Sequence, residues 1–276
     1  MPQIINTNIV SLNAQRNLNT SQMSLATSMQ RLSSGLRVNS SKDDAAGLAI
    51  AERMSSQVRG MNVAIRNSND AVSLAQTAEG AIGKVGDMLQ RMRELAVQSA
   101  NATNGTSDRA SLDQEFQALA DEIDRTLGAT KFNGLSILAT NAGAQAFQVG
   151  ANNGELITVT TTRLDNNASV TAVTGATSAV SSAASASAAL TNIDLALDLV
   201  NSQRALYGAT QSRFDAVISN LQIAVENQSA ARSRIMDADF AAETANLSRA
   251  QILQQAGNAM VAQANQLPNQ VLALLR

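Results

Sequence analysis

The sequence predicts a mainly α-helical protein, a long antiparallel helical coiled coil or bundle with a small β-hairpin region and with its N- and C-terminal segments paired at one end. Three observations carry this prediction. Apolar residues recur at spacings of three and four over stretches longer than an ordinary helix, only 2% of residues are aromatic, and both ends of the chain almost lack charge. Because large globular cores use more aromatic side chains, we expect long thin helices with shallow seams.

The C-terminal segment has the most unusual composition, because no charged residue lies between Arg249 and Arg276. Its other positions are mostly Gln, Asn and Ala, too polar for a helix that spans a bilayer and too poor in charge for an ordinary surface helix. An apolar stripe recurs here at alternating spacings of four and three, formed by Leu253, Gly257, Met260, Ala264, Leu267, Val271 and Leu274. We expect other chains to complete this helix.

The N-terminal segment mirrors the C-terminal one. Arg16 is the only charged side chain in residues 1–30, and Ile5, Ile9 and Leu12 mark one helical face. Two frayed termini would be the simplest alternative, but disordered tails are normally charged or rich in Pro and Ser. We therefore expect the two ends to pack on each other, or to share one environment.

Turn signals divide the rest of the first half. Gly35 is expected to end the first helix, and a long helix then follows to about residue 100, in coiled-coil style. Residues 101–107 form a turn, with Ser107 as a candidate N-cap of the next helix. Phe132-Asn133-Gly134 signals another turn, and residues 146–150 and 156–159 flank an Asn-Asn-Gly connection that is typical of a β-hairpin.

Residues 166–189 are almost entirely Ala, Ser, Thr, Val and Gly, and we expect a flexible loop or short exposed insertion with no part in a core. Its hydroxyl groups leave O-linked sugars open as an alternative. Periodicity returns at Leu190 and Leu197, and counting in sevens from there reaches Leu253 and Met260. The C-terminal half is thus expected to be helical over many turns.

Composition excludes several function classes. A net charge of −2 and a pI near 5.2 argue against nucleic-acid binding. The chain has no Cys and no His, which removes the usual zinc sites, thiol catalysis and Ser-His-Asp triads. The acidic pairs, which we expect to be solvated or ion-paired rather than catalytic or metal-binding, are Asp43-Asp44, Asp121-Glu122 and Asp237 with Asp239. We predict no catalytic residue, no metal, no cofactor, no membrane insertion and no cleaved signal peptide.

Several long motifs resemble bacterial flagellin. The N-terminal ones are residues 32–40 (LSSGLRVNS), 42–50 (KDDAAGLAI) and 90–101 (QRMRELAVQSAN). The later ones are residues 132–134 (FNG), 148–152 (QVGAN), 231–235 (ARSRI), 251–257 (QILQQAG), 262–266 (AQANQ) and 271–276 (VLALLR). Since the middle of the chain is short, the likeness is to a minimal flagellin without outer variable domains.

This resemblance implies a structural subunit that polymerises into the bacterial flagellar filament for motility. The implied division is 1–43 (inner-tube helix), 44–160 (first part of the helical core domain, with the hairpin), 161–189 (variable segment), 190–238 (returning core helix) and 239–276 (inner-tube helix). Residues implied to pack in the filament core are Ile5, Ile9, Leu12, Leu253, Met260, Leu267, Val271 and Leu274. In the free monomer we expect about the first and last 40 residues to be unprotected.

The resemblance also implies partners and a location. They are an export chaperone on the C-terminal segment, the filament cap, the hook-junction proteins and host flagellin receptors, with type III export to the extracellular flagellum. The Toll-like receptor patch carries over to Arg91, Leu95 and Glu115, with Leu95 expected at the margin of the apolar surface. Inflammasome-type receptors are implied to contact Leu272, Leu274 and Leu275.

Two alternatives to a filament subunit remain at this point. One is a hook–filament junction protein, which shares parts of both end signatures. The other, from a different class, is a secreted enzyme on a coiled-coil stalk, against which the missing catalytic residues argue.

Overall fold

A computed structural model describes residues 7–175 and 178–273, with side chains described as far as Gln266. The helices are α1 (Ile9–Ser34), α2 (Ala45–Ala100), α3 (Thr106–Ala129), α4 (Ala168–Thr174), α5 (Ala183–Met236) and α6 (Phe240–Ala273). The strands are β1 (Lys131–Phe132), β2 (Leu135–Ser136), β3 (Ala144–Gln148) and β4 (Leu156–Thr160). The predicted fold class, mainly α with a small antiparallel strand pair, is confirmed.

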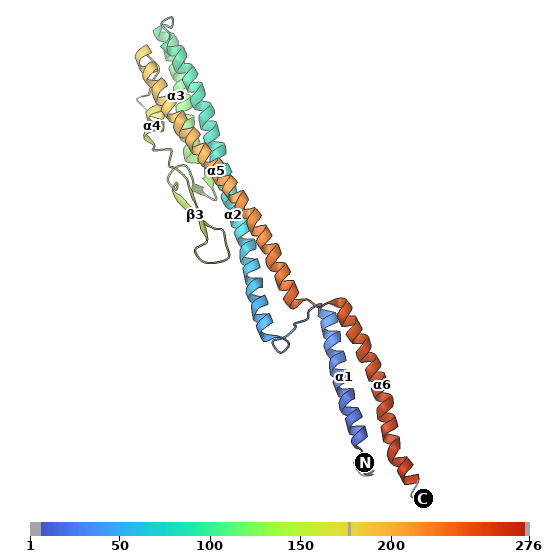
Figure 1. Ribbon diagram of the computed structural model, residues 1–276. Coiled ribbons are helices and arrows are strands. Elements are labelled where there is room, and N and C mark those ends of the chain that lie inside the picture. Colours follow the sequence, from blue (N-terminus) through green and yellow to red (C-terminus); the bar gives the residue numbers. More distant parts are fainter. Residues whose placement is uncertain (1–6, 176–177, 274–276) are drawn as a thin grey trace. The chain divides into compact units, whose positions relative to one another are not determined.

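The chain forms two compact units, one of residues 1–56 and 227–276 and the other of residues 57–226. The predicted five-part division stays a prediction, and helices α2 and α6 begin at Ala45 and Phe240. In the first unit α1 and α6 lie side by side (Figure 1), so the two ends of the chain pair as expected. Their direction is antiparallel, because Arg31 contacts Glu243 whereas Ser11 contacts Asn265.

The linkers of the first unit are tied together beside the helix ends. Gly35 ends α1 in the left-handed region at φ 72°, which glycine adopts without a steric penalty, as the turn prediction required. Leu36 pairs with Asp237 in an isolated antiparallel bridge. A small apolar cluster of Val38, Ala51 and Met236 lies next to it.

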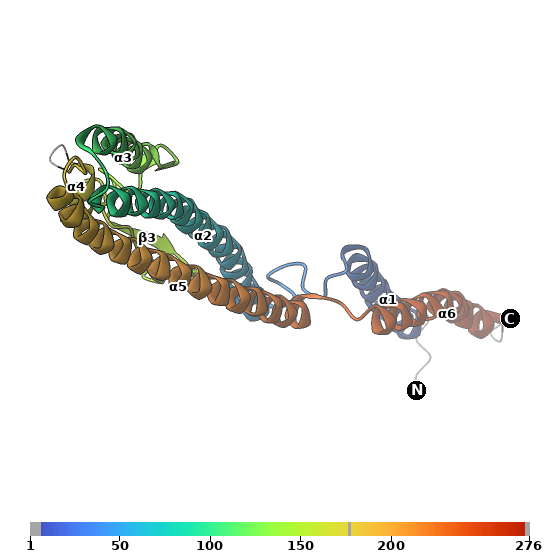
Figure 2. The ribbon, with the colours of Figure 1, turned by 90° about the horizontal axis from the view of Figure 1, so that it is seen from above.

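The second unit is built around two antiparallel helices. Glu79 and Arg93 of α2 contact Gln211 and Asp194 of α5, so the contact position falls along α5 as it rises along α2. Helix α3 packs beside α2, and the views in Figures 1 and 2 agree on this arrangement. The core between these elements is fully buried and includes Ile82, Leu89, Met92, Phe116, Ile123, Tyr207 and Phe214.

Two antiparallel hairpins close one side of this core. The turn at residues 133–134 joins β1 to β2, and both of its residues have positive φ, 49° for Asn133 and 81° for Gly134, as a two-residue hairpin turn requires. Strands β3 and β4 pair in the register Ala146 opposite Thr158, which confirms the predicted hairpin. Phe147 of β3 meets Phe214 of α5 edge to face, with ring centroids 6.1 Å apart.

The segment at residues 166–189 differs from its predicted role as an exposed loop. Residues 168–174 form α4, and α5 already begins at Ala183. Val170, Val173 and Val180 are buried in the main core. Short side chains suffice here because α3 lies close by: Asp113 accepts a hydrogen bond from the backbone N–H of Val180 at 2.7 Å, and Gln117 donates to the carbonyl of Ser178.

Two finer predictions also change. Ser107 does not cap α3, because Gly105 precedes the helix and its N–H donates to the Asp108 carboxylate at 3.0 Å. A carboxylate in the first turn thus takes the capping role. In α5 the buried frame of seven is not that of Leu190 and Leu197, which are half-buried, but is formed by Ala186, Ile193, Val200, Tyr207 and Phe214.

Helix α5 also contains, among the described residues, the one window apolar and long enough to cross a membrane by composition alone, with a mean hydropathy of 1.2. Only 28% of that window is buried. Its helix carries buried side chains such as Ile193 and Val200 into the core, so the core of the unit accounts for part of the apolar pattern.

Candidate assembly surface on the terminal helices

The seam between α1 and α6 is made mostly of small or polar side chains. On α1 the residues that face α6 recur at spacings of three and four, as Ser11, Ala14, Leu18, Ser21, Leu25, Ser28 and Leu32. On α6 the corresponding set is Glu243, Leu247, Ala250, Gln254, Gly257, Val261 and Ala264. The backbones approach closely at Gly257, where an added Cβ would lie 3.1 Å from Leu18 Cδ1.

Polar contacts fix the register of this seam. Asn8 Nδ2 donates to the Ala264 carbonyl at 2.7 Å, and the Ser11 hydroxyl donates to Asn265 Oδ1 at 2.7 Å. At the other end Arg31 lies 3.9 Å from Glu243, whose side chain is 10% exposed. Of the uncharged polar residues of the C-terminal segment, Asn265 thus bonds across the pair, and among the described residues Glu243 is the one buried acid of this seam.

Only some residues of the predicted apolar stripe of α6 face α1. Gly257 and Ala264 face α1, whereas Leu253 and Met260 lie on the flank of the helix, 50% and 60% exposed. On α1, Ile9 and Leu12 are likewise 64% and 57% exposed. These four bulky apolar side chains are therefore left uncovered, whereas the fully buried positions of the seam carry small side chains or Glu243, and its leucines are half-buried.

The other predicted core-packing residues lie outside what the structure describes. Ile5 and Leu274 fall outside the described residues, and the side chains of Leu267 and Val271 are also outside them. Sequence reasoning missed Met23 and Ile252, which are exposed on the same two helices, whereas it placed Met29, 57% exposed, on a second apolar face of the first helix with Leu25 and Leu32. It also missed the remaining seam residues of α1, namely Ser11, Ala14, Leu18, Ser21 and Ser28, although their heptad spacing was visible in the sequence.

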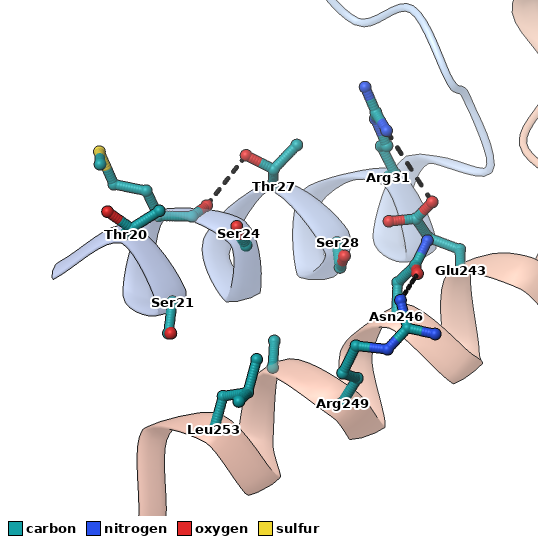
Figure 3. Close-up of a pocket in the computed structure, with 12 residues that line it drawn as sticks. Thr20, Ser21, Ser24, Thr27, Ser28, Arg31, Glu243, Asn246, Arg249 and Leu253 are labelled. Atoms are coloured by element: carbon teal, nitrogen blue, oxygen red, sulfur yellow. Dashed lines mark hydrogen bonds and ion pairs between the residues drawn. The ribbon is translucent and has the colours of Figure 1, made fainter. Parts of the chain in front are cut away.

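One groove runs along the flank of the α1–α6 pair. Its apolar part is lined by Val10, Asn13, Asn17, Leu253, Ala256 and Met260, among others. Its polar part is lined by five hydroxyl side chains together with Arg31, Glu243 and Arg249 (Figure 3). Ser21 and Leu253 line both parts, so they form one groove that follows α1 for about 30 Å, at 1.5 Å per residue.

Charge in the polar part of the groove is only partly compensated. Glu243 lies near Arg31, and Arg249 contacts the side-chain oxygen of Asn246 at 3.4 Å (Figure 3). Small hydroxyl and alanine side chains on the floor allow another helix to approach closely. The groove therefore has the length and mixed lining suited to a helix rather than to a small molecule.

The residues carried over for Toll-like receptor binding divide into two groups. Arg91 bridges Glu94 and Glu115, at 2.8 Å to each, and all three side chains are about half exposed or more. These acids raise the pKa of Arg91 above its usual value. Leu95, by contrast, is 1% exposed in the main core and does not lie at a surface margin. Its side chain points inward because Leu89, Met92 and Leu95 follow the buried face of α2.

Residues carried over for inflammasome-type receptors are not described. Leu274 and Leu275 lie outside the described residues, as does the side chain of Leu272.

The acidic pairs act as caps or ion pairs. The Asp43 carboxylate accepts from the backbone N–H groups of Asn39 and Ser40 and from the Ser40 hydroxyl, and these bonds lower its pKa. Asp44 caps α2 through the N–H of Gly47, and Asp239 caps α6. Arg125 lowers the pKa of Glu122. Within the described part of the chain, no group of three or more acidic side chains is arranged to hold a metal ion.

Known proteins share both halves of the chain. Residues 5–143 match the bacterial flagellin N-terminal helical region, and residues 190–275 match the bacterial flagellin C-terminal helical region. A flagellin of Halalkalibacterium halodurans is 48% identical over 273 residues, which cover 99% of this chain and 100% of that protein.

Solved structures agree with this. The crystal structure of Bacillus cereus flagellin is similar with a TM-score of 0.51 and 35% identity, over 56% of this chain and 88% of that one. A structure titled as a hook-associated flagellar protein of Vibrio parahaemolyticus has a TM-score of 0.59 over 71% of this chain and 100% of its own, and at 15% identity it shows a shared fold alone.

Proposed function

This chain belongs to the bacterial flagellin family, and from that membership we infer that the flank of its α1–α6 pair is a surface on which a second copy packs. Proteins of this family are structural and not enzymes, and they polymerise into the extracellular filament of the flagellum. The chain is accordingly a filament subunit that serves motility, and the junction-protein alternative is not favoured. In our proposal, the copies meet along that flank.

The observation that carries this proposal is the inverted distribution of apolar side chains in α1 and α6. Ile9, Leu12, Leu253 and Met260 are each at least half exposed, although no charged neighbour within the C-terminal segment would keep such a surface soluble. Contiguous exposed apolar surface on a soluble chain marks an interaction site. The groove beside it accepts a helix, and the abundant partner in a filament is another copy.

The contact between copies is of the kind that does not close. The groove and the exposed apolar residues Ile9 and Leu12 of α1 are different surfaces of the same unit, so a copy that presents one to its neighbour keeps the other free. Such a heterologous contact produces an open helical polymer instead of a closed ring. Because the seam within one copy buries mainly small side chains, we also propose that the pair becomes fully ordered only on assembly.

Leu253→Gln tests the surface. Leu253 is already half exposed, and glutamine has a similar helix propensity, so the free subunit should fold unchanged. In the polymer the substitution removes burial worth about 1 kcal/mol and introduces an amide that needs a partner, so the critical concentration should rise about tenfold.

A matched control is Leu156→Gln, because Leu156 of β4 is 52% exposed and lies in the other unit. Seeded elongation followed by light scattering measures both variants. Wild-type elongation by Leu253→Gln, with a folded monomer by circular dichroism, would contradict the assignment of this flank.

Further partners follow the family resemblance as proposals. We propose an export chaperone that covers the C-terminal segment before assembly, the filament cap and hook-junction proteins at the two ends of the polymer, and export without a cleaved signal peptide. The absence of cleavage has a direct test. The intact mass of the subunit from a sheared filament should equal the 28.8 kDa of the whole chain, and a smaller mass with a missing N-terminus would refute it.

For host recognition we propose Arg91 and Glu115 as contacts of the Toll-like receptor. Both are half exposed and already bonded to each other, so a receptor would use the pair as one polar unit. Leu95 supports this surface from inside the core and makes no direct contact. Arg91→Ala should weaken receptor signalling, and unchanged signalling would remove the assignment. The inflammasome contacts at Leu272, Leu274 and Leu275 stay a proposal from resemblance.

A further inference from the structure

We propose that three exposed methionines, Met23, Met29 and Met260, make the assembly of this protein sensitive to oxidation. The oxidant would be a peroxide, and the modified atoms would be the three thioether sulfurs. The inference rests on the assembly surface proposed above, and its experiment separates the two.

The methionines of the described residues fall into distinct groups. Met23, Met29 and Met260 are 65%, 57% and 60% exposed, and all three lie on α1 or α6. Met92 and Met236 are 0% and 6% exposed in the two apolar clusters, and Met54, Met61 and Met88 of α2 are half-buried. Methionine usually fills gaps in a core, so three exposed methionines on the two helices that build the assembly surface are unusual, and their sulfur atoms are open to solvent.

Two of the exposed sulfurs lie on the groove itself. Met260 lines its apolar part together with Val10 and Leu253, and Met23 lines its polar part with Thr20 and Thr27. Met29 lies on α1 beyond them. A second helix seated in the groove would therefore cover Met23 and Met260 with apolar contacts.

Apart from methionine, the chain has no side chain that reacts readily with a mild oxidant. The sequence has no Cys, no Trp and no His. Methionine sulfur is then the most readily oxidised side-chain atom present, and exposure decides which methionines react first.

The chemical step is a transfer of one oxygen atom. The sulfur lone pair attacks one oxygen of hydrogen peroxide, an S–O bond forms as the O–O bond breaks, and a proton shift releases water. Sulfur is oxidised by two electrons and the peroxide is reduced by two. The product is a polar, chiral sulfoxide, which a sulfoxide reductase can return to the thioether.

The modification should act on free subunits more than on filaments. A sulfoxide that must enter an apolar contact loses its hydration without gaining a hydrogen-bond partner, so oxidised subunits add poorly. In an assembled filament the neighbouring copy shields Met23 and Met260. Oxidation would thus limit growth while it spares polymer already made.

The test compares the full-length chain with a triple variant, Met23→Leu, Met29→Leu and Met260→Leu, which keeps apolar volume without a sulfur atom. Both proteins are treated as monomers with hydrogen peroxide, peptide masses locate the added oxygen, and seeded elongation is measured. We expect oxygen at the three exposed sites and none at Met92 or Met236. Each protein is compared with its own untreated sample, and peroxide should slow elongation at least about fivefold for the wild-type chain but not for the triple variant. Treatment with a methionine sulfoxide reductase should restore the rate.

Two results would overturn the inference. One is a wild-type chain that carries all three sulfoxides and elongates at its untreated rate. The other is a treated triple variant that slows as much as the treated wild type. If Leu253→Gln is slow while the oxidised wild type is not, this inference fails and the assembly surface stands. If Leu253→Gln elongates normally, the surface itself fails.

Discussion

Replacing Gly60 of α2 with alanine should destabilise the unit formed by residues 57–226, although alanine is the better helix former. A Cβ at this position would lie 2.9 Å from the Ala151 Cβ and 3.1 Å from the Ala151 Cα. The Ala151 backbone cannot rotate away, because the hairpin is held to α2 by the hydrogen bond from Asn67 Nδ2 to the Gln148 carbonyl at 3.0 Å.

Gly80 of the same helix supplies the control. An added Cβ there meets no atom within 4 Å, so Gly80→Ala should gain only the helix-propensity term of about 0.5–1 kcal/mol. Gly60→Ala gains the same term but adds overpacking of about 1–3 kcal/mol. The propensity terms cancel between the two variants, and the difference in unfolding free energy should be about 2 kcal/mol.

The assay uses the only tyrosine of a chain without tryptophan. Tyr207 is 1% exposed in the core of this unit, so its fluorescence reports the unfolding of that unit. With a urea m-value of about 2 kcal/mol/M, the two midpoints should differ by roughly 1 M, with Gly80→Ala above the wild type and Gly60→Ala below it. Equal midpoints, or a higher one for Gly60→Ala, would refute the close approach of the hairpin to α2.

Two further predictions concern pH. The Tyr207 hydroxyl is buried with no hydrogen-bond partner in the described structure. Burial raises its pKa to about 12, while the nearby Thr162 backbone acts in the opposite direction. Since an unfolded tyrosine ionises near pH 10, the free energy of unfolding should fall as pH rises from about 10 to 12. Tyr207→Phe should lack that fall and should be about 1 kcal/mol more stable at neutral pH, because no buried hydroxyl is left without a partner. A phenol that titrates normally near pH 10 in the folded chain would contradict this prediction. Hydrogen bonds from Ser40 and Asn39 lower the pKa of Asp43. The backbone amides of Ser40 and Asn39 should therefore stay protected from hydrogen exchange as pH falls through the ordinary aspartate range, and lose that protection only below it. Asp43→Asn should reduce the protection of both amides at every pH, which amide exchange would measure.

Local chemistry made several features of this fold predictable. Gly35 and the Asn133-Gly134 step end or reverse the chain because glycine and asparagine tolerate positive φ. The spacing of apolar residues predicted the long helices, and the pairing of the chain ends followed from their shared lack of charge. The Ser107 cap failed because the helix begins earlier, at Thr106, so that Ser107 lies inside the first turn and the Asp108 carboxylate accepts the N–H of Gly105 instead.

Sequence alone determined that this chain makes long helices, that it turns back through a hairpin, and that both of its terminal segments almost lack charged side chains. Tertiary structure decided which of the overlapping stripes on α6 faces α1, because Gly257 and Ala250 allow closer backbones than Leu253 and Met260 would. It also brought Val170, Val173 and Val180 into the core, because α3 covers these side chains, which their own segment is too short to bury. Periodicity specifies a face only relative to the helix that carries it, and the neighbouring element settles which face is buried.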